Sequence, residues 1–177
     1  MLNYSDRLPL DWSPGLTANA GDTQRAATNL YVLEAVAAIE EQSRDRLVED
    51  QAELHQELHR LDAKVQLLLD MVARLLRSHD RLPREHLVRV AVDAIDVCTQ
   101  AEIAVGDEGT LSLHLHPAIP AALILEGRFT AESEDVDGRW LRFELVPLAG
   151  LEAEAMSRHV FRHHRRSIAA ARQASIS

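Results

Sequence analysis

The longest regular pattern of apolar positions lies between Gly21 and Pro83, a stretch that contains no glycine and no proline. In its second half, leucine and valine recur in alternating steps of three and four residues, at Leu54, Leu58, Leu61, Val65, Leu68, Val72 and Leu75. This heptad step predicts a helix that buries its apolar stripe only by packing against other helices. We therefore expect residues 22–82 to form one long helix, or two joined at a break, that holds copies of the chain together.

The residues beside the heptad stripe bear on how many helices pack together. Valine at the a positions and leucine at the d positions favour a parallel dimer. However, Leu69 and Leu76 fall at e positions and Met71 at a g position, which widens the apolar surface. A surface this wide is better buried among more than two helices. We expect a parallel tetramer, with a dimer as the alternative.

Residues 1–21 combine helix-breaking and apolar side chains. Pro9, Pro14 and Gly15 exclude a stable helix, whereas Tyr4 and Trp12 are unusual in a free linker. The sequence predicts an irregular arm that packs on the globular part of the chain or on a neighbouring subunit.

From His86 onward the apolar pattern changes to a period of two, which is typical of strands. Valine-rich and alternating runs are separated by turn signals, of which Asp137-Gly138 is the strongest. These runs predict a small antiparallel barrel or sandwich. Residues 83–177 would thus form a barrel domain with its own apolar set. We expect residues 84–177 to fold without the rest of the chain.

After Gly150 the helical period returns and predicts a C-terminal helix. We expect arginines and histidines on its outer face, and an inward stripe of Leu151, Ala155, Met156, Val160, Phe161 and Ile168. The predicted fold class is α+β: a long N-terminal coiled-coil helix, a small antiparallel β-barrel and a C-terminal helix.

Composition limits the classes of partner and the cellular compartment that we expect for this chain. The chain has 177 residues and a net charge of −9, which argues against general binding to nucleic acid. Cys98 is the only cysteine, so no intrachain disulfide forms, as is usual in the cytoplasm. The first residues do not resemble a signal peptide, and no run approaches the ~18 apolar residues of a membrane span. We expect a cytoplasmic protein that does not insert into membranes.

The residue types that perform catalysis are not arranged in any recognised motif. The sequence contains no Walker loop, no nucleophile elbow and no pair of cysteines, so we expect no enzymatic activity and no cofactor. Two pairs of histidines, His55 with His59 and His159 with His163, have a metal-binding spacing but lack the glutamate of HExxH. We interpret both pairs as exposed helix faces and expect no metal.

Two other groups of polar residues are candidates for contacts. His114 and His116 alternate with leucines and therefore share one sheet face, open to solvent or a partner. The C-terminal helix is locally basic, with Arg158, Arg162, Arg165, Arg166 and Arg172. These arginines form either an ordinary exposed face, some of it paired with acidic residues of the predicted helix over 22–82, or a contact for an anionic ligand or acidic partner.

The order of elements resembles a PilZ domain over about residues 84 to 173. The resemblance rests on the strand VRVAVDAIDV, the turn GDEGTLSLHLHP, the run ALILEGRF before RWLRFELV, and the helix AMSRHVFRHHRRSIAAARQ. The opening NYSDRLPLDW with the heptad helix resembles a tetrameric subgroup of xanthomonad PilZ proteins. The resemblance implies assembly through a parallel four-helix coiled coil and a role in bacterial signalling, in type IV pilus function, motility or virulence.

PilZ domains usually bind cyclic di-GMP through two motifs, RxxxR and (D/N)xSxxG. Arg77 and Arg81 have the first spacing. In the frame that best fits the strands, the second motif falls on 89–94, where Asp, Ser and Gly become Arg, Ala and Ala. An alternative frame, 96–101, keeps only the aspartate. The loss of glycine matters most, because a Cβ atom blocks close approach of the backbone.

The sequence therefore predicts a non-catalytic PilZ-like adaptor that oligomerises, acts on an unidentified protein partner and binds cyclic di-GMP poorly. The alternative is a cyclic di-GMP receptor with a rebuilt pocket that uses Arg77, Arg81 and Arg84.

Overall fold

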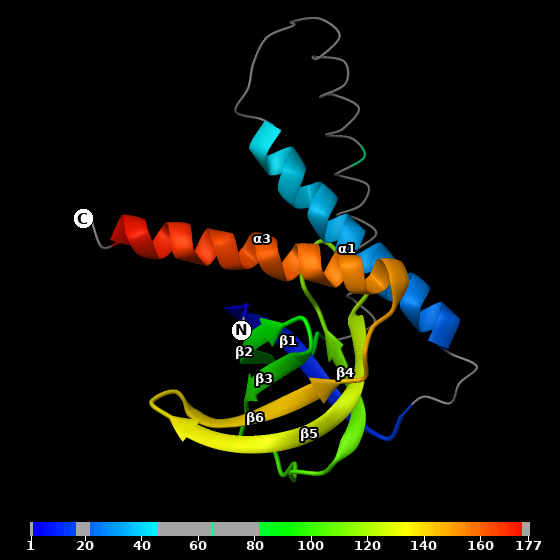
Figure 1. Cartoon of the computed structure of the whole chain (residues 1–177), viewed down its shortest axis with the longest axis vertical. Coiled ribbons are helices and arrows are strands. Elements are labelled where there is room, and N and C mark those ends of the chain that lie inside the picture. The colour runs from blue at the N-terminus through cyan, green and yellow to red at the C-terminus, as the bar shows by residue number, and fades with distance from the viewer. Residues whose placement is uncertain (1, 17–21, 46–64, 66–81, 175–177) are drawn as a thin grey trace, which may run out of the picture.

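A computed structural model describes residues 2–16, 22–45, 65 and 82–174 of the chain (Figure 1). In these ranges the elements are β1 (Asn3–Pro14), α1 (Asp22–Asp45), β2 (Glu85–Ala91), β3 (Ala94–Cys98), β4 (Glu108–Leu113), β5 (Leu123–Asp135), β6 (Gly138–Leu145) and α3 (Gly150–Ala174). The two helices cross each other on one side of the sheet (Figure 1). Among the described helices, none is long and apolar enough to span a membrane.

The strands form a closed antiparallel barrel in the order β1-β2-β3-β6-β5-β4. Strand β1 closes it, because residues 3–9 pair with β2 and residues 10–14 pair with β4. Pro9 lies where β1 passes from one partner to the other, a position at which a strand tolerates the missing N–H group. The next residue, Leu10, donates its backbone N–H to the carbonyl of Arg84 at 3.1 Å.

The predicted irregular conformation of residues 1–21 is therefore wrong, since Asn3–Pro14 is a barrel strand, but this segment does pack on the globular part of the chain. Proline excludes a helix but not a strand at this edge. The apolar residues Tyr4, Leu8 and Leu10 alternate along β1 and are buried. The barrel is also incomplete within residues 84–177, because β2 and β4 would both become unpaired edges without β1.

Aromatic and aliphatic side chains fill the barrel. Phe129 packs edge-on against Phe143 at 4.9 Å and against Trp12 at 5.9 Å between ring centroids. Gly109 on β4 allows β1 to approach, because a Cβ atom there would lie 2.3 Å from the carbonyl oxygen of Ser13. The core also includes Val88, Val90, Ile95, Val97, Leu111, Leu113, Leu123, Leu125 and Leu141.

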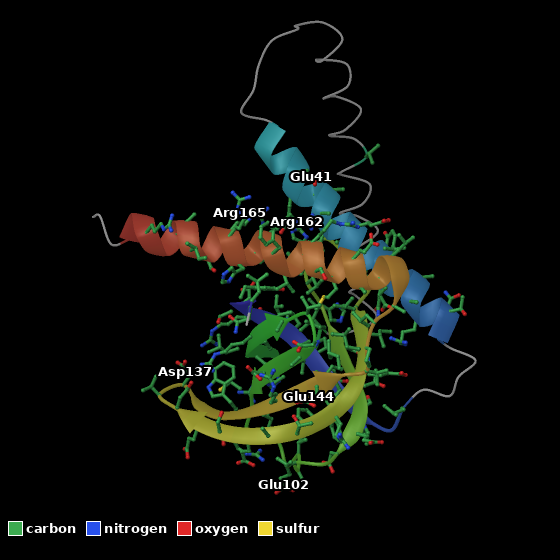
Figure 2. All side chains as sticks on the ribbon, viewed as in Figure 1. Glu41, Glu102, Asp137, Glu144, Arg162 and Arg165 are labelled. Carbon is green, nitrogen blue, oxygen red and sulfur yellow. The ribbon has the colours of Figure 1, made fainter. Side chains whose placement is uncertain are left out.

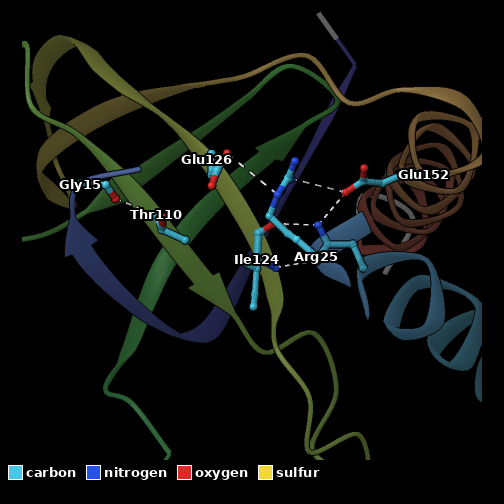
Figure 3. Close-up of polar contacts among 7 residues, drawn as sticks. Gly15, Arg25, Thr110, Ile124, Glu126 and Glu152 are labelled. Carbon is cyan, nitrogen blue, oxygen red and sulfur yellow. Dashed lines mark hydrogen bonds and ion pairs between the residues drawn. The ribbon is translucent and has the colours of Figure 1, made fainter. Parts of the chain in front are cut away.

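Polar side chains between α1, β5 and α3 join the helix to the barrel through hydrogen bonds and ion pairs (Figure 3). The side chain of Asn29 is fully buried; it accepts from the N–H of Ile124 on β5 at 2.7 Å and donates to the carbonyl of the same residue at 2.7 Å. Its amide also donates to Glu152 of α3 at 2.6 Å. Arg25 lies 3.9 Å from both Glu126 and Glu152. These contacts of Asn29 and Arg25 hold α1 against β5 and α3.

The long N-terminal coiled-coil helix is not what the structure shows at this end of the chain. The first element is β1, and α1 buries Val32, Leu33 and Val36 in the core that the barrel and helices share. Leu33 keeps a d position of the heptad register, whereas Val32 and Val36 do not, and all three belong to this shared core. Of the seven predicted heptad residues, only Val65 is described, and it is 51% exposed. The other six, together with His55 and His59, lie outside the described residues, so the coiled coil stays a prediction.

The C-terminal helix α3 forms as predicted, but its orientation differs from the expected stripe. Ala155, Met156 and Val160 are buried. Leu151 and Phe161, expected to face inward, are 64% and 50% exposed. Ile168 is also exposed, whereas His159 is only 1% exposed. The predicted stripe spanned too wide an arc of the helix to be buried against one surface.

Candidate functional site

A cleft of about 530 Å³ lies where the start of β2 meets the end of β3. Three strands, β1, β2 and β3, and the segments next to them form its walls. The lining residues are Arg7, Arg84, Glu85, His86, Leu87, Cys98, Thr99, Gln100, Ala101 and Asp137. The cleft thus brings residues from β1, β2, the segment after β3 and the turn between β5 and β6 to one place.

The segment after β3 is held by its own polar contacts. Thr99 donates its backbone N–H to the carbonyl of Arg139 at 3.0 Å, and its hydroxyl accepts from the N–H of Ala101 at 3.1 Å. The guanidinium of Arg139 donates to the carbonyls of Ala101 and Ile103, at 2.8 Å each. A ring nitrogen of His86 lies 3.2 Å from the carbonyl of Cys98. Backbone groups that could meet a ligand are therefore engaged within the chain.

Charges of both signs line the cleft. Arg7 and Arg84 are exposed and could contact phosphate or carboxylate groups. Glu85 and Asp137 line the same cleft and would repel such groups. The thiol of Cys98 donates to the carbonyl of Asp137 at 3.3 Å, so its contact is structural. The lining suits a polar ligand but does not form a uniformly basic phosphate site.

The two frames proposed for the second motif lie in different parts of the barrel. In the alternative frame, residues 98–101 line the cleft beside Arg84, while Asp96 accepts from Arg142 at 3.1 Å. The frame that best fits the strands, 89–94, does not line the cleft. Its Arg89 donates to Asp135 at 2.7 Å and lies 3.8 Å from the ring centroid of Trp140.

Of the three arginines proposed for a rebuilt pocket, Arg84 lines the cleft. Arg77 and Arg81 lie outside the described residues. Sequence reasoning missed Arg7, which β1 brings to the cleft. The alternation of Tyr4, Leu8 and Leu10 could have predicted a strand there, but the prolines outweighed it.

A second polar group joins β1, α1 and α3 beneath the crossing of the helices. The carboxylate of Glu40 on α1 contacts three nitrogen-bearing side chains of α3. The distances are 2.6 Å to Arg166, 2.8 Å to His163 and 3.4 Å to Arg162. The hydroxyl of Tyr4 lies 2.8 Å from Nε2 of His159, and its ring stacks on His163 at 4.5 Å. The prediction that His159 and His163 form an exposed face is therefore wrong.

Burial and charge set the protonation of this group. Burial, and after it the charge of His163, lower the pKa of His159 to about 3. Burial and then the charge of Asp6 raise the pKa of Tyr4, so its hydroxyl stays protonated beside neutral His159, to which it is hydrogen-bonded. Burial acts to raise the pKa of Glu40, but hydrogen bonds from His163 and Arg166 outweigh it and lower that pKa to about 2. Glu40 is an anion and His159 is neutral at pH 7.

The remaining candidates from the sequence are the histidines after β4, the metal sites and the arginines of α3. His114 and His116 line an apolar groove of about 180 Å³ together with Pro117 and Ile119, and burial lowers the pKa of His114. Within the described part of the chain, no group of three or more histidine, cysteine or carboxylate side chains could hold a metal ion. The five arginines of α3 divide: Arg162 and Arg166 meet Glu40, whereas Arg158, Arg165 and Arg172 are exposed.

A known protein family matches most of this chain. The sequence model of the atypical PilZ domain, described as a cyclic di-GMP receptor, matches residues 33–173. Among curated proteins, no sequence is significantly similar to this chain.

Solved structures that match this chain include the following two. One is a pathogenic protein from Xanthomonas campestris, described as a new tetrameric PilZ domain self-assembled via an unusual helical bundle. It is 27% identical, with a TM-score of 0.77 over 95% of this chain and 91% of that one. The other is the inhibitor of motility from Bacillus subtilis, 16% identical, with a TM-score of 0.36 over 46% of this chain and 42% of that one. The second likeness is too weak to support an argument.

Proposed function

We propose, from the premise that this chain belongs to the atypical PilZ domain family, that it is a non-catalytic signalling adaptor which binds cyclic di-GMP poorly. The cleft beside Arg84 carries the proposal. Where the family motif has serine and glycine, the cleft has Cys98 and Ala101. The backbone groups of Thr99 and Ala101 are already hydrogen-bonded within the chain, and two carboxylates share the lining.

Calorimetric titration of cyclic di-GMP into the full chain at near-physiological salt tests this proposal. We expect no saturable heat at tens of micromolar protein and no shift in thermal unfolding. A saturable isotherm of micromolar affinity would contradict it. The paired variant Cys98→Ser with Ala101→Gly sharpens the test, because it restores the small residues of the motif in the cleft.

A receptor with a rebuilt pocket is the second candidate. It is favoured by one observation: Arg7 and Arg84 are exposed in the same cleft. Two guanidinium groups could hold the two phosphates of a cyclic dinucleotide. If heat is observed, Arg84→Ala and Arg7→Ala should each weaken binding at least tenfold. The matched control is Arg128→Ala, an exposed arginine on β5 that does not line this cleft.

We also propose that the chain assembles through its heptad residues, as a parallel tetramer. Support comes from the heptad step itself and from the similar Xanthomonas protein, which is described as tetrameric. Leu61→Asn with Leu68→Asn should reduce the mass in light scattering to that of one chain, because both residues fall at d positions. Gln56→Asn with Ala63→Asn, at outward f positions, is the control. An unchanged mass in the first variant would contradict the register.

The proposed setting is the cytoplasm of a bacterium, in type IV pilus function, motility or virulence. It is supported by the lone cysteine, the family and the pathogenic Xanthomonas relative. An assembly that displays several barrels gains avidity for a protein partner without tight single contacts. Affinity capture with the full chain should retain a specific protein, and capture with the Leu61→Asn, Leu68→Asn variant should lose it.

A further inference from the structure

The outer face of α1 carries a regular exposed stripe. It consists of Ala27, Tyr31, Glu34, Ala38 and Glu41, which follow one another in steps of four, three, four and three residues. All five side chains are exposed, and Tyr31 is 59% exposed. This acidic stripe therefore has the spacing of a helix face that packs on another helix.

The outer face of α3 carries a second stripe of the same kind but opposite charge. It consists of Arg158, Phe161, Arg165, Ile168 and Arg172, in steps of three, four, three and four. Phe161 is 50% and Ile168 is 40% exposed, and the guanidinium of Arg165 lies 5.7 Å from the ring centroid of Phe161. Exposed large apolar residues between regularly spaced charges are typical of a contact surface.

We propose that the basic stripe of α3 in one copy packs antiparallel on the acidic stripe of α1 in a second copy. In this orientation the steps of the two stripes coincide at every position. The resulting partners are Glu41 with Arg158, Ala38 with Phe161, Glu34 with Arg165, Tyr31 with Ile168, and Ala27 with Arg172. Each glutamate meets an arginine, and the large Phe161 meets the small Ala38.

The parallel orientation fits less well. A parallel alignment that keeps the steps in phase sets Glu34 against Phe161 and Glu41 against Ile168, or Glu34 against Ile168. Such an alignment would desolvate a carboxylate against an apolar side chain, at a cost in free energy. The charge and size pattern therefore selects the antiparallel register.

The two stripes cannot meet within one chain. The opposite faces of α1 and α3 pack on each other and on the barrel, where Glu40 contacts Arg162 and Arg166. In Figure 2 the labelled Glu41 and Arg165 lie on the side of the helices away from the barrel. The inner contact already pairs a glutamate of α1 with arginines of α3, and the outer stripes repeat this chemistry for a second copy.

Long-range charge also favours this partner. The chain as a whole carries a net charge of −9, whereas the stripe on α3 carries three arginines. The negative charge of a second copy therefore attracts this stripe. An anionic membrane would instead repel most of the surface. The stripes lie outside residues 46–81 in the sequence, so no heptad residue takes part in the proposed contact.

The test uses the full chain with Leu61→Asn and Leu68→Asn, so that any heptad assembly is removed from the measurement. Sedimentation equilibrium at high protein concentration should show association that weakens as salt increases. The variants Glu34→Arg with Glu41→Arg, and Arg158→Glu with Arg165→Glu, should each remain single chains. Their mixture should associate, because every contact is then again between opposite charges. This recovery also shows that both variants are folded.

Glu102→Arg with Glu144→Arg makes the same change of charge on the barrel surface and is the matched control, so it should associate as the parent does (Figure 2). A parent that stays a single chain at all concentrations would overturn the proposal. So would association of either reversed variant alone at the parent's strength. A single-chain parent that binds vesicles of anionic lipid through Arg165 would assign the basic stripe to a membrane instead.

Discussion

The chain has two groups of arginines whose surroundings are opposite. Beneath the crossing of α1 and α3, Arg162 and Arg166 meet the carboxylate of Glu40, whose side chain is only 11% exposed. At the cleft, Arg7 and Arg84 lie in solvent beside the segment 98–101. The first group holds three elements together, so replacing its carboxylate should cost stability. The second group is exposed to solvent, so we expect it to contribute little to folding.

Strand β1 contributes to both groups, with Tyr4 in the buried one and Arg7 in the cleft. Deletion of residues 1–16 should therefore abolish both. It would open the barrel between β2 and β4 and remove three buried core residues. We expect loss of the cooperative thermal transition in circular dichroism, with aggregation through the exposed edges. Cooperative unfolding of a soluble 17–177 fragment would contradict this expectation.

Replacement of Glu40 by alanine tests the buried group. Arg162, His163 and Arg166 would lose their shared acceptor, which we expect to cost about 3 kcal/mol in the free energy of unfolding. The matched control is the next residue: Glu41→Ala removes an exposed carboxylate and should change stability by less than about 0.5 kcal/mol. Urea denaturation measures both, and equal effects would contradict the assignment.

Acid should weaken the buried group before it affects the cleft. The pKa of His159 is lowered to about 3 in the fold, so only the unfolded chain binds this proton between pH 6.5 and 3. Stability should fall as pH drops through that window, by about 1.4 kcal/mol for each pH unit from this residue. Glu40, with its pKa lowered to about 2, loses its contribution as pH drops from 4.5 toward 2. Urea denaturation across pH should show the steeper decline below 4.5.

His159→Gln isolates the histidine, since glutamine can still accept from Tyr4 but does not titrate. Between pH 6.5 and 4.5, the free energy of unfolding should fall less steeply in this variant, by about 1.4 kcal/mol per pH unit, which corresponds to one proton. An identical pH dependence in the variant and the parent would show that His159 is not the source.

The smallest effect is expected at the cleft. Arg84→Ala and Arg7→Ala each remove an exposed side chain, so we expect changes in stability below about 0.5 kcal/mol. Chemical denaturation checks this expectation in the same series as Glu40→Ala. A loss above about 1 kcal/mol would mean that the cleft, like the buried group, is part of the folding framework.

Local patterns predicted much of the fold. The period of two after His86 and the turn at Asp137-Gly138 predicted antiparallel strands, which are present, and the helical period after Gly150 predicted α3. The resemblance to PilZ domains is confirmed by the family match over residues 33–173. These features depend on neighbours close in sequence, so the sequence alone was sufficient to predict them.

The candidate site was only partly predictable. The sequence suggested Arg84, which lines the cleft, but only the barrel shows that residues 98–101, and not 89–94, lie beside it. Arg7 was missed because its position depends on pairing between β1 and a strand about eighty residues later. The proline content of the first residues concealed that pairing.

The sequence by itself determined the strand-rich C-terminal half, the final helix and the family, because periodicity and turn residues act over a few positions. Only the tertiary structure decided that the N-terminus closes the barrel and that His159 is buried on Tyr4. It also decided that Phe161 and Ile168 face outward with the arginines of α3. Each of these depends on contacts between segments far apart in the chain, such as the pairing of β1 with β2 and β4, and local preference carries no information about which distant surfaces meet.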